Sequence, residues 1–284
     1  MSTTQDFSGY GGTWCPGCGD WAIGMAIKQA FVQLELTPSS LMVFFDIGCS
    51  GNMNDYLNAY AMHGLHGRSI PTALGAKLAN HTLRAVVVGG DGGIYGEGGN
   101  HFLHACRGNH DITVIVHDNG VYGLTTGQVA PTADKGYRSK STPAGIIEFP
   151  ANPLALALSQ GASFVAQSFA GDLPHVVETI KKGVSHKGFS LINILQPCVT
   201  FNKVNTYQYY LPKVYKLDES YDPTDLREAF HKTNESLEEK FPLGVLYQVS
   251  RPAFHEEVSH LPADISLGMR PAFTQLEALI KQFV

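Results

Sequence analysis

Short runs of apolar residues, rich in valine and isoleucine, constrain the fold of this chain more than any other feature. The runs cover residues 41–45, 84–88, 112–116, 163–166 and 190–195. Because apolar residues follow one another in them with little alternation, they predict strands covered on both faces, as in a parallel sheet. The stretches between the runs have helical spacing and predict helices over 20–34, 72–80, 98–107, 153–160 and 173–182, the last capped by Asp172. This alternation predicts an α/β fold, a mostly parallel sheet with helices on both faces.

Composition excludes several classes of protein. With 284 residues and 44% hydrophobic content, the chain can bury a substantial core. Its net charge of −5 and the lack of any long run of Lys and Arg argue against nucleic-acid binding. The N-terminus lacks the apolar core of a signal peptide, and no stretch reaches the roughly 18 apolar residues of a membrane span. We therefore expect a cytoplasmic protein that does not enter membranes.

The character of the sequence changes after Asn205. Tyrosines crowd the next stretch, which is interrupted by Pro212 and Pro223. Residues 224–239 are polar with helical spacing, 241–247 predict a short strand, and 272–284 predict a terminal helix. We expect a domain over residues 1–205 and a C-terminal arm over 206–284 that packs on this domain or on a partner subunit.

Polar and glycine-rich segments follow three of the predicted strands. These segments are 47–50, 90–92 and 119–120, and the carboxyl ends of parallel strands form the edge where open α/β sheets bind ligands. Asp91 and Asn119 offer the hard oxygen ligands that magnesium prefers when it binds a diphosphate. The glycines around Asp91 permit close backbone approach, and the helix beginning near Gly98 could help to neutralise a diphosphate. The alternative is that Gly-Asp-Gly is a tight turn and Asn119-Gly120 a simple loop.

Four of the five cysteines lie in small, turn-rich contexts, at Cys15, Cys18, Cys49 and Cys198. Without a secretion signal we expect reduced thiols, which favours metal binding or redox use over disulfides. Sets of four cysteines bind zinc or a [4Fe-4S] cluster, and spacing does not separate the two. Cys106 lies on a predicted helix face, where we expect a small buried hydrophobic residue.

The pattern Gly90-Asp91-Gly92 with Asn119 resembles the signature of thiamine diphosphate enzymes. In that signature the Asp, the Asn and a backbone carbonyl two residues later, here that of Val121, hold magnesium. The segments 65–68, 98–105 and 121–128 resemble the beta subunit of the 2-oxoacid:ferredoxin oxidoreductases. This resemblance covers roughly residues 10–205 and, more loosely, the stretch to about 258. It implies a thiamine diphosphate-binding fold.

The resemblance also implies the site. Cys15, Cys18, Cys49 and Cys198 match the ligands of one [4Fe-4S] cluster near the thiamine ring, and His66 is the candidate catalytic residue. The residues expected to contact thiamine diphosphate are Ile47, Gly48, Cys49, Ser50, His66, Gly67, Gly90, Asp91, Gly92, Gly93, Asn119, Val121, Gly123, Leu124 and Thr125.

The activity implied is that of an oxidoreductase, the reversible oxidative decarboxylation of pyruvate or 2-oxoglutarate with coenzyme A, which gives acyl-CoA and CO2 and reduces ferredoxin. The expected partners are therefore ferredoxin and an alpha subunit, which supplies the glutamate that activates the aminopyrimidine. The cofactor carries the carbon chemistry, and an adjacent one-electron acceptor takes up the electrons.

Two other functions stay open. The chain could be a subunit of a non-redox thiamine diphosphate-dependent 2-oxoacid decarboxylase with a structural zinc, or a non-catalytic iron-sulfur electron-transfer subunit.

Several further polar residues have an expected role with an alternative. His66 could instead be a loop histidine satisfied by the backbone, and Arg68 and Asn52 are candidate substrate-pocket residues. Asn52 stands where some relatives that accept 2-oxoglutarate carry a lysine, so the resemblance implies no strong cationic grip on a second carboxylate. We assign His101, His104, His110 and His117 to packing or capping. The basic residues Lys135, Arg138 and Lys140 form either a solvated loop or a segment that closes over substrate or coenzyme A.

Overall fold

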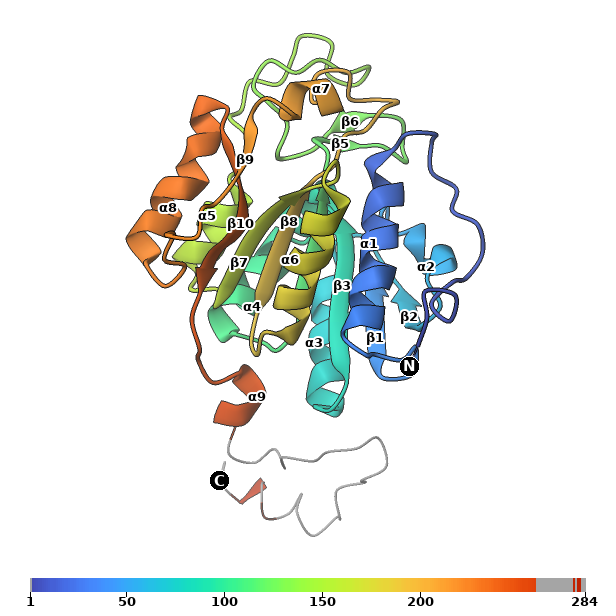
Figure 1. Ribbon diagram of the computed structural model, residues 1–284, viewed down its shortest axis with the longest axis vertical. Coiled ribbons are helices and arrows are strands. Elements are labelled where there is room, and N and C mark those ends of the chain that lie inside the picture. Colours follow the sequence, from blue (N-terminus) through green and yellow to red (C-terminus); the bar gives the residue numbers. More distant parts are fainter. Residues whose placement is uncertain (1, 259–277, 279, 282–284) are drawn as a thin grey trace.

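The computed structural model describes residues 2–258, 278, 280 and 281, and its centre is an eight-stranded sheet (Figure 1). The strand order is β2-β1-β3-β4-β8-β7-β10-β9. Neighbouring strands are parallel throughout, except for the antiparallel pair of β7 and β10. The strands are β1 (Leu41–Phe45), β2 (Tyr60–His63), β3 (Arg84–Gly90), β4 (Thr113–Asp118), β7 (Phe164–Phe169), β8 (Ser190–Leu195), β9 (Val214–Lys216) and β10 (Phe241–Gln248). A separate hairpin pairs β5 (Val121–Tyr122) with β6 (Gln128–Val129).

Helices cover both faces of this sheet. On one face α1 (Gly19–Gln33) packs beside α6 (Leu173–Ser185) over β1, β3, β4, β7 and β8. The opposite face is covered by α3 (Ser69–Ala79), α4 (Gly99–Gly108), α5 (Pro153–Ser159) and α8 (Leu226–Asn234). Shorter elements complete the chain, namely α2 (Met53–Tyr56), α7 (Tyr207–Tyr210), α9 (Phe254–Glu257), the π-helix η1 (Gly92–Glu97) and the 3₁₀ helix η2 (Glu235–Glu238). The two apolar layers bury the central strands of the sheet on both sides.

The predicted α/β fold is confirmed, and each predicted strand and helix before residue 205 is present within a few residues of its expected ends. Asp172 caps α6 as expected, because its carboxylate accepts a hydrogen bond from the His175 amide. The helix expected over 98–107 is present as α4, and an additional, unpredicted helical segment, η1, precedes it directly after Asp91. The glycine-rich segment 92–97 lacks apolar periodicity, so its helical turns leave no pattern in the sequence.

The C-terminal segment extends the sheet. Strand β10 pairs with β7 and β9 pairs with β10, while α8 packs on the face that α5 covers. The predicted helical stretch 224–239 and strand 241–247 are confirmed as α8 with η2 and as β10. The predicted helix over 272–284 lies almost entirely outside the described residues. Within the described residues, none of the helices combines the length and the apolar character that spanning a bilayer requires.

Candidate functional site

A cavity lies at the carboxyl ends of β1, β3 and β4, beyond the last residues of these parallel strands. Its lining contains each of the predicted cofactor-binding residues except Gly67 and Gly93, and it adds His117 and Tyr122. The lining residues are Ile47, Gly48, Cys49, Ser50, His66, Gly90, Asp91, Gly92, His117, Asn119, Val121, Tyr122, Gly123, Leu124 and Thr125. Segments far apart in the sequence therefore meet where sheet topology predicts a ligand site.

Asp91 is the buried acid of this cavity. Its Oδ1 accepts a hydrogen bond from the Gly92 amide (2.9 Å), and its Oδ2 accepts from the Gly120 amide (2.7 Å). The Thr132 hydroxyl lies 2.6 Å from Asp91 Oδ2 and 2.7 Å from Asp118 Oδ1, so its single proton serves one carboxylate at a time. Burial and the nearby Asp118 carboxylate raise the pKa of Asp91 above its ordinary value. A cation beside this carboxylate would favour its ionised form.

Asn119 presents its side-chain oxygen with a fixed orientation. Asn119 Oδ1 accepts from the Val121 amide at 2.9 Å, whereas Nδ2 donates to Gln196 Oε1 at 2.7 Å. Three buried polar atoms of the lining, Ser50 Oγ, His66 Nδ1 and His117 Nε2, have no hydrogen-bond partner among the described residues. Burial of such atoms is costly unless a partner is present, so the cavity fits a polar ligand. Together with the oxygens of Asp91 and Asn119, it fits a magnesium diphosphate.

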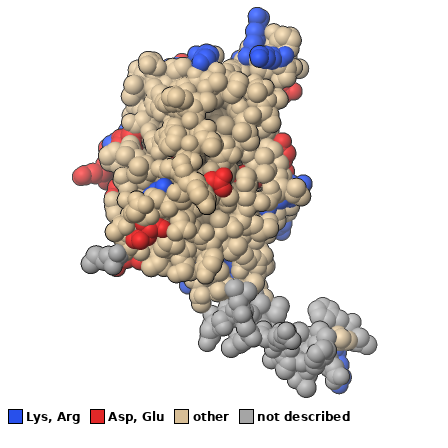
Figure 2. All heavy atoms as spheres, turned by 90° about the vertical axis from the view of Figure 1, so that its right-hand side faces the viewer, with Lys and Arg blue, Asp and Glu red and all other residues tan. Residues whose placement is uncertain are grey.

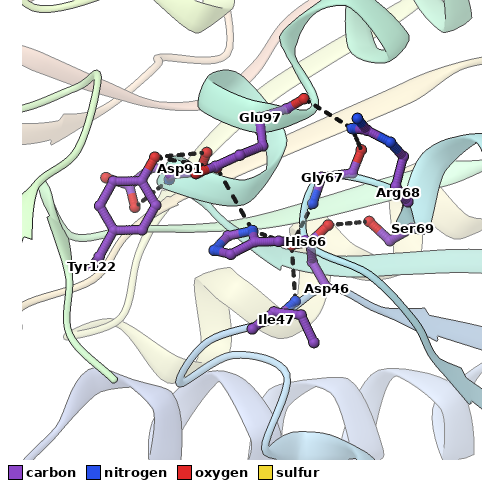
Figure 3. Close-up of polar contacts among 10 residues, drawn as sticks. Asp46, Ile47, His66, Gly67, Arg68, Ser69, Asp91, Glu97 and Tyr122 are labelled. Carbon is purple, nitrogen blue, oxygen red and sulfur yellow. Dashed lines mark hydrogen bonds and ion pairs between the residues drawn. The ribbon is translucent and has the colours of Figure 1, made fainter. Parts of the chain in front are cut away.

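His66 is oriented by a buried carboxylate, that of Asp46 (Figure 3). Asp46 is the first residue after β1, and its Oδ1 lies 3.0 Å from His66 Nδ1. The same carboxylate accepts hydrogen bonds from the amides of Ile47 and Gly67 and from the Ser69 hydroxyl. These bonds fix the carboxylate, and they hold it within ion-pair distance of the imidazole ring that lines the cavity.

A second acid lies on the outer side of the same histidine. Glu97 Oε2 lies 3.6 Å from His66 Nδ1 and 3.2 Å from the Tyr122 hydroxyl, which donates to it. Arg68 is not part of the cavity lining, because its guanidinium donates to the carbonyl oxygens of Gly67 and Glu97. The arginine therefore ties the loop after β2 to the end of η1.

Gly67 and Gly93 serve this network instead of lining the cavity. A Cβ at Gly93 would lie 2.4 Å from Asp46 Oδ1, closer than a real contact permits. Gly67 has a positive φ of 68°, and a Cβ there would lie 2.5 Å from the Glu97 carbonyl carbon. Only glycine lets these backbones approach Asp46 and η1 so closely.

The four predicted thiol ligands line a second cavity. Cys15 and Cys18 lie just before α1, Cys49 follows β1, and Cys198 follows β8. Cys15 is exposed, Cys49 is half-buried, and Cys18 and Cys198 are buried. Cys106 is fully buried in the apolar layer beneath α4, away from this set, as expected for a packing residue.

The two cavities share part of their walls. Cys49, Asn119, Gly123 and Leu124 line both of them. A Cβ at Gly123 would lie 3.3 Å from Cys49 Sγ and 3.8 Å from Cys198 Sγ, so this glycine lies directly against both thiols. A group bound by the cysteines would therefore be a neighbour of a cofactor bound at Asp91.

The thiols surround a space instead of converging on a point. In the described part of the chain, no three His, Cys, Asp or Glu side chains are arranged as ligands of a single metal ion. Burial, with a contribution from the Asp20 carboxylate, raises the pKa of Cys18 far above its usual value, and burial raises that of Cys49 to about 12. Such thiols ionise only with a cation beside them. A four-iron cluster fits this donor set, because each thiolate binds a different iron.

Comparisons with known proteins identify the family. The family described as "Thiamine pyrophosphate enzyme, C-terminal TPP binding domain" matches residues 46–194, and the family of the C-terminal part of the pyruvate ferredoxin oxidoreductase beta subunit matches residues 198–263. The beta subunit of 2-oxoacid:ferredoxin oxidoreductase from Saccharolobus solfataricus is 44% identical over 86% of this chain and 84% of its own length. A beta subunit of the same name from a Sulfolobus species is 41% identical over 93% of this chain and 90% of its own length. The chain belongs to the 2-oxoacid:ferredoxin oxidoreductase beta-subunit family.

A solved structure agrees with this assignment. It is a 2-oxoglutarate:ferredoxin oxidoreductase from Magnetococcus marinus with 2-oxoglutarate, coenzyme A and succinyl-CoA bound. The TM-score is 0.91 at 35% identity, and the alignment covers 98% of this chain and 96% of the other. The predicted thiamine diphosphate-binding fold is thereby confirmed.

Some site residues of this family member were not predicted from the sequence. Asp46 and Gln196 each come directly after a strand, as Asp91 does, and this position at the carboxyl edge was the available signal. His117 was assigned to packing or capping, but its ring lines the cavity while its Nδ1 lies 2.5 Å from Asp20 Oδ1. Tyr122 lines the cavity between two predicted cofactor-binding residues, Val121 and Gly123, and this position in the sequence was the available signal.

Other residues lie outside the cofactor cavity. Asn52 lines the cysteine cavity and donates to the Thr13 hydroxyl, and Lys135 lies over the Phe149 ring. His110 stacks on Phe254, in line with a packing role.

Proposed function

We propose that this beta subunit, joined to an alpha subunit, catalyses the reversible oxidative decarboxylation of a 2-oxoacid, pyruvate or 2-oxoglutarate, with coenzyme A and ferredoxin. One observation carries the proposal: the cavity at Asp91 and the cavity of four thiols share a wall. A decarboxylase that passes no electrons has no need of a redox centre at this position. Family membership supports the same reaction.

In this proposal Asp91, Asn119 and the Val121 carbonyl would hold magnesium together with the diphosphate of thiamine diphosphate. When bound, thiamine diphosphate supplies the electron sink for loss of CO2, and a [4Fe-4S] cluster on Cys15, Cys18, Cys49 and Cys198 accepts single electrons. Ser50 and His117 offer polar atoms that have no partner among the described residues and that would contact the bound cofactor.

His66 is the proposed catalytic residue of this chain. Its Nδ1 faces the Asp46 carboxylate, which leaves Nε2 as the atom available to the cavity. A histidine held in this way can bond the oxygen of the reacting carbonyl or move a proton at it. We expect Asp46 to set the orientation and tautomer of the ring, as carboxylates do for other active-site histidines.

The proposed site is completed by a partner subunit. No glutamate lines the cofactor cavity in the part of the chain that the structure describes, although the family resemblance requires one at the aminopyrimidine. Figure 2 views the side where β2 and α2 lie in Figure 1, and charged side chains are sparse across most of this face. Every residue of the edge strand β2 is exposed, including Tyr60 and Met62. A face with few charges and exposed apolar side chains is typical of a surface that binds another protein chain, so we expect the partner subunit to cover it.

The C-terminal arm belongs to the same proposal. We keep the division into a cofactor domain over 1–205 and an arm over 206–284. The described part of the arm packs on the domain, because Tyr210 and Leu243 form a buried cluster with Phe169 and Leu195.

The proposal is tested on the chain co-purified with its partner subunit. We expect iron, acid-labile sulfide and bound thiamine diphosphate, together with reduction of a dye by a 2-oxoacid and coenzyme A. Asp91→Ala should abolish turnover while the cluster is retained. Full turnover in Asp91→Ala would instead favour an electron-transfer subunit without its own chemistry.

A further inference from the structure

Gln196 lies between the two cavities. It is the first residue after β8, it is buried, and its amide donates to the Asp118 carbonyl at 2.7 Å. Its side chain lines the cysteine cavity and contacts one predicted ligand from each site. On one side Asn119 Nδ2 donates to Gln196 Oε1 at 2.7 Å, and on the other Gln196 Nε2 donates to Cys18 Sγ at 3.2 Å.

The orientation of this amide is fixed by its neighbours. Gln196 Nε2 also donates to the Pro197 carbonyl at 3.0 Å, and a carbonyl accepts but does not donate. The oxygen Oε1 must therefore face Asn119. The Asn119 amide is oriented in the same way. The Val121 backbone N–H can only donate, so the atom of Asn119 that it contacts must be the oxygen Oδ1, and the nitrogen Nδ2 must face Gln196. Both amides then have one consistent arrangement, in which the oxygen of Asn119 stays available to a cation.

The start of α1 is shaped around this side chain. A Cβ at Gly19 would lie 2.8 Å from Gln196 Cγ, and the Gly19 amide donates to the Pro197 carbonyl. The glycine directly after Cys18 thus lets the helix approach closely enough for the bond from Gln196 to the sulfur. Gln196 is held from both sides and has little freedom to turn away.

We propose that Gln196 is a positioning residue that links the magnesium ligand Asn119 to the cluster ligand Cys18. The inference rests on the proposed function of the two cavities. Through Oε1 it keeps the Asn119 amide turned with its oxygen toward the cation. Through Nε2 it donates to the Cys18 sulfur, and a hydrogen bond to a ligand sulfur stabilises the reduced, more negative cluster and raises its reduction potential.

Two substitutions separate these two roles. Gln196→Glu has the same shape and keeps an oxygen that accepts from Asn119, but it replaces the N–H donor to Cys18 by a carboxyl oxygen and adds a negative charge when it ionises. Gln196→Leu loses both. The matched control is Gln167→Glu, because Gln167 is a buried glutamine on β7 whose Nε2 donates to the Pro242 carbonyl at 3.0 Å, outside both cavities.

The experiment uses the complex of the chain with its partner subunit. The reduction potential is taken from an EPR-monitored redox titration, with the cluster signal assigned as the one lost in Cys198→Ser. The affinity for magnesium thiamine diphosphate is measured by calorimetry. Because the potential is read from loaded clusters alone, partial loss of cluster does not affect it.

We expect a more negative potential in both Gln196 variants and no shift in Gln167→Glu. Affinity for magnesium thiamine diphosphate should fall about tenfold in Gln196→Leu, the effect of one lost buried hydrogen bond, and stay near the native value in Gln196→Glu. A native potential in Gln196→Leu, which removes the donor without adding a charge, would overturn the inference, as would an equal shift in Gln167→Glu. A native complex that holds no cluster or no thiamine diphosphate would instead overturn the proposed function.

Discussion

At the scale of single residues, the account depends on how closely Gly93 approaches Asp46. Replacing Gly93 by Ala places a Cβ too close to Asp46 Oδ1 and near His66 Cε1, so the carboxylate and the His66 ring must move. A shift of about 1 Å in a catalytic group costs on the order of a hundredfold in rate. We expect Gly93→Ala to lower kcat about a hundredfold while thiamine diphosphate is retained, as steady-state kinetics and thiamine analysis would measure.

The control for this change is Gly99→Ala. A Cβ at Gly99, in the first turn of α4, meets no atom within 4 Å, and alanine favours a helix. Equal kcat in the two variants would show that the space around Asp46 has no bearing on catalysis.

The cysteines supply a second prediction at this scale. Cys198→Ser should lose most of the iron and sulfide, because serine is a poor substitute for a thiolate ligand. Cys106→Ala removes a sulfur from the apolar layer to which α4 contributes, and this variant should keep its iron and sulfide. The substitution should lower the free energy of unfolding by about 1 kcal/mol. Iron and sulfide assays on the purified complex decide this. Equal iron in both variants would exclude Cys198 as a ligand.

At the scale of elements, strand β10 is a structural part of the sheet. Leu246 on this strand is fully buried against the layer formed by α5 and α8, whereas Leu237 on η2 is 72% exposed. We expect Leu246→Ala to lower the free energy of unfolding by about 3 kcal/mol and Leu237→Ala to change it by less than about 0.5 kcal/mol. Urea denaturation of the purified chain would measure both. Similar values for the two would contradict the role of β10 in the core.

The elements also show how far sequence alone leads. Strands such as 84–88 were predictable because buried parallel strands are continuously apolar, and their carboxyl ends correctly indicated where Asp91 and Asn119 meet. Strand β2 was not predicted, since its residues are all exposed and give no burial signal. The π-helix after Asp91 was missed because glycines carry no periodicity.

At the scale of the whole molecule, residues brought together from distant segments were the hardest to foresee. Asp46 and Gln196 act through contacts with residues 20 and 77 positions away, at His66 and Asn119. A single sequence marks such residues only as polar groups after strands. The topology of the sheet supplies the missing information, because it gathers the carboxyl ends of β1, β3, β4 and β8 at one edge.

The central claim is that a redox cluster lies beside thiamine diphosphate in this chain. The most direct measurement is the visible absorption of the anaerobic complex before and after addition of a 2-oxoacid and coenzyme A. We predict a broad brown absorption that bleaches when substrate is added, because electrons from the 2-oxoacid reduce the cluster. A colourless complex that decarboxylates the 2-oxoacid at full rate would contradict the account.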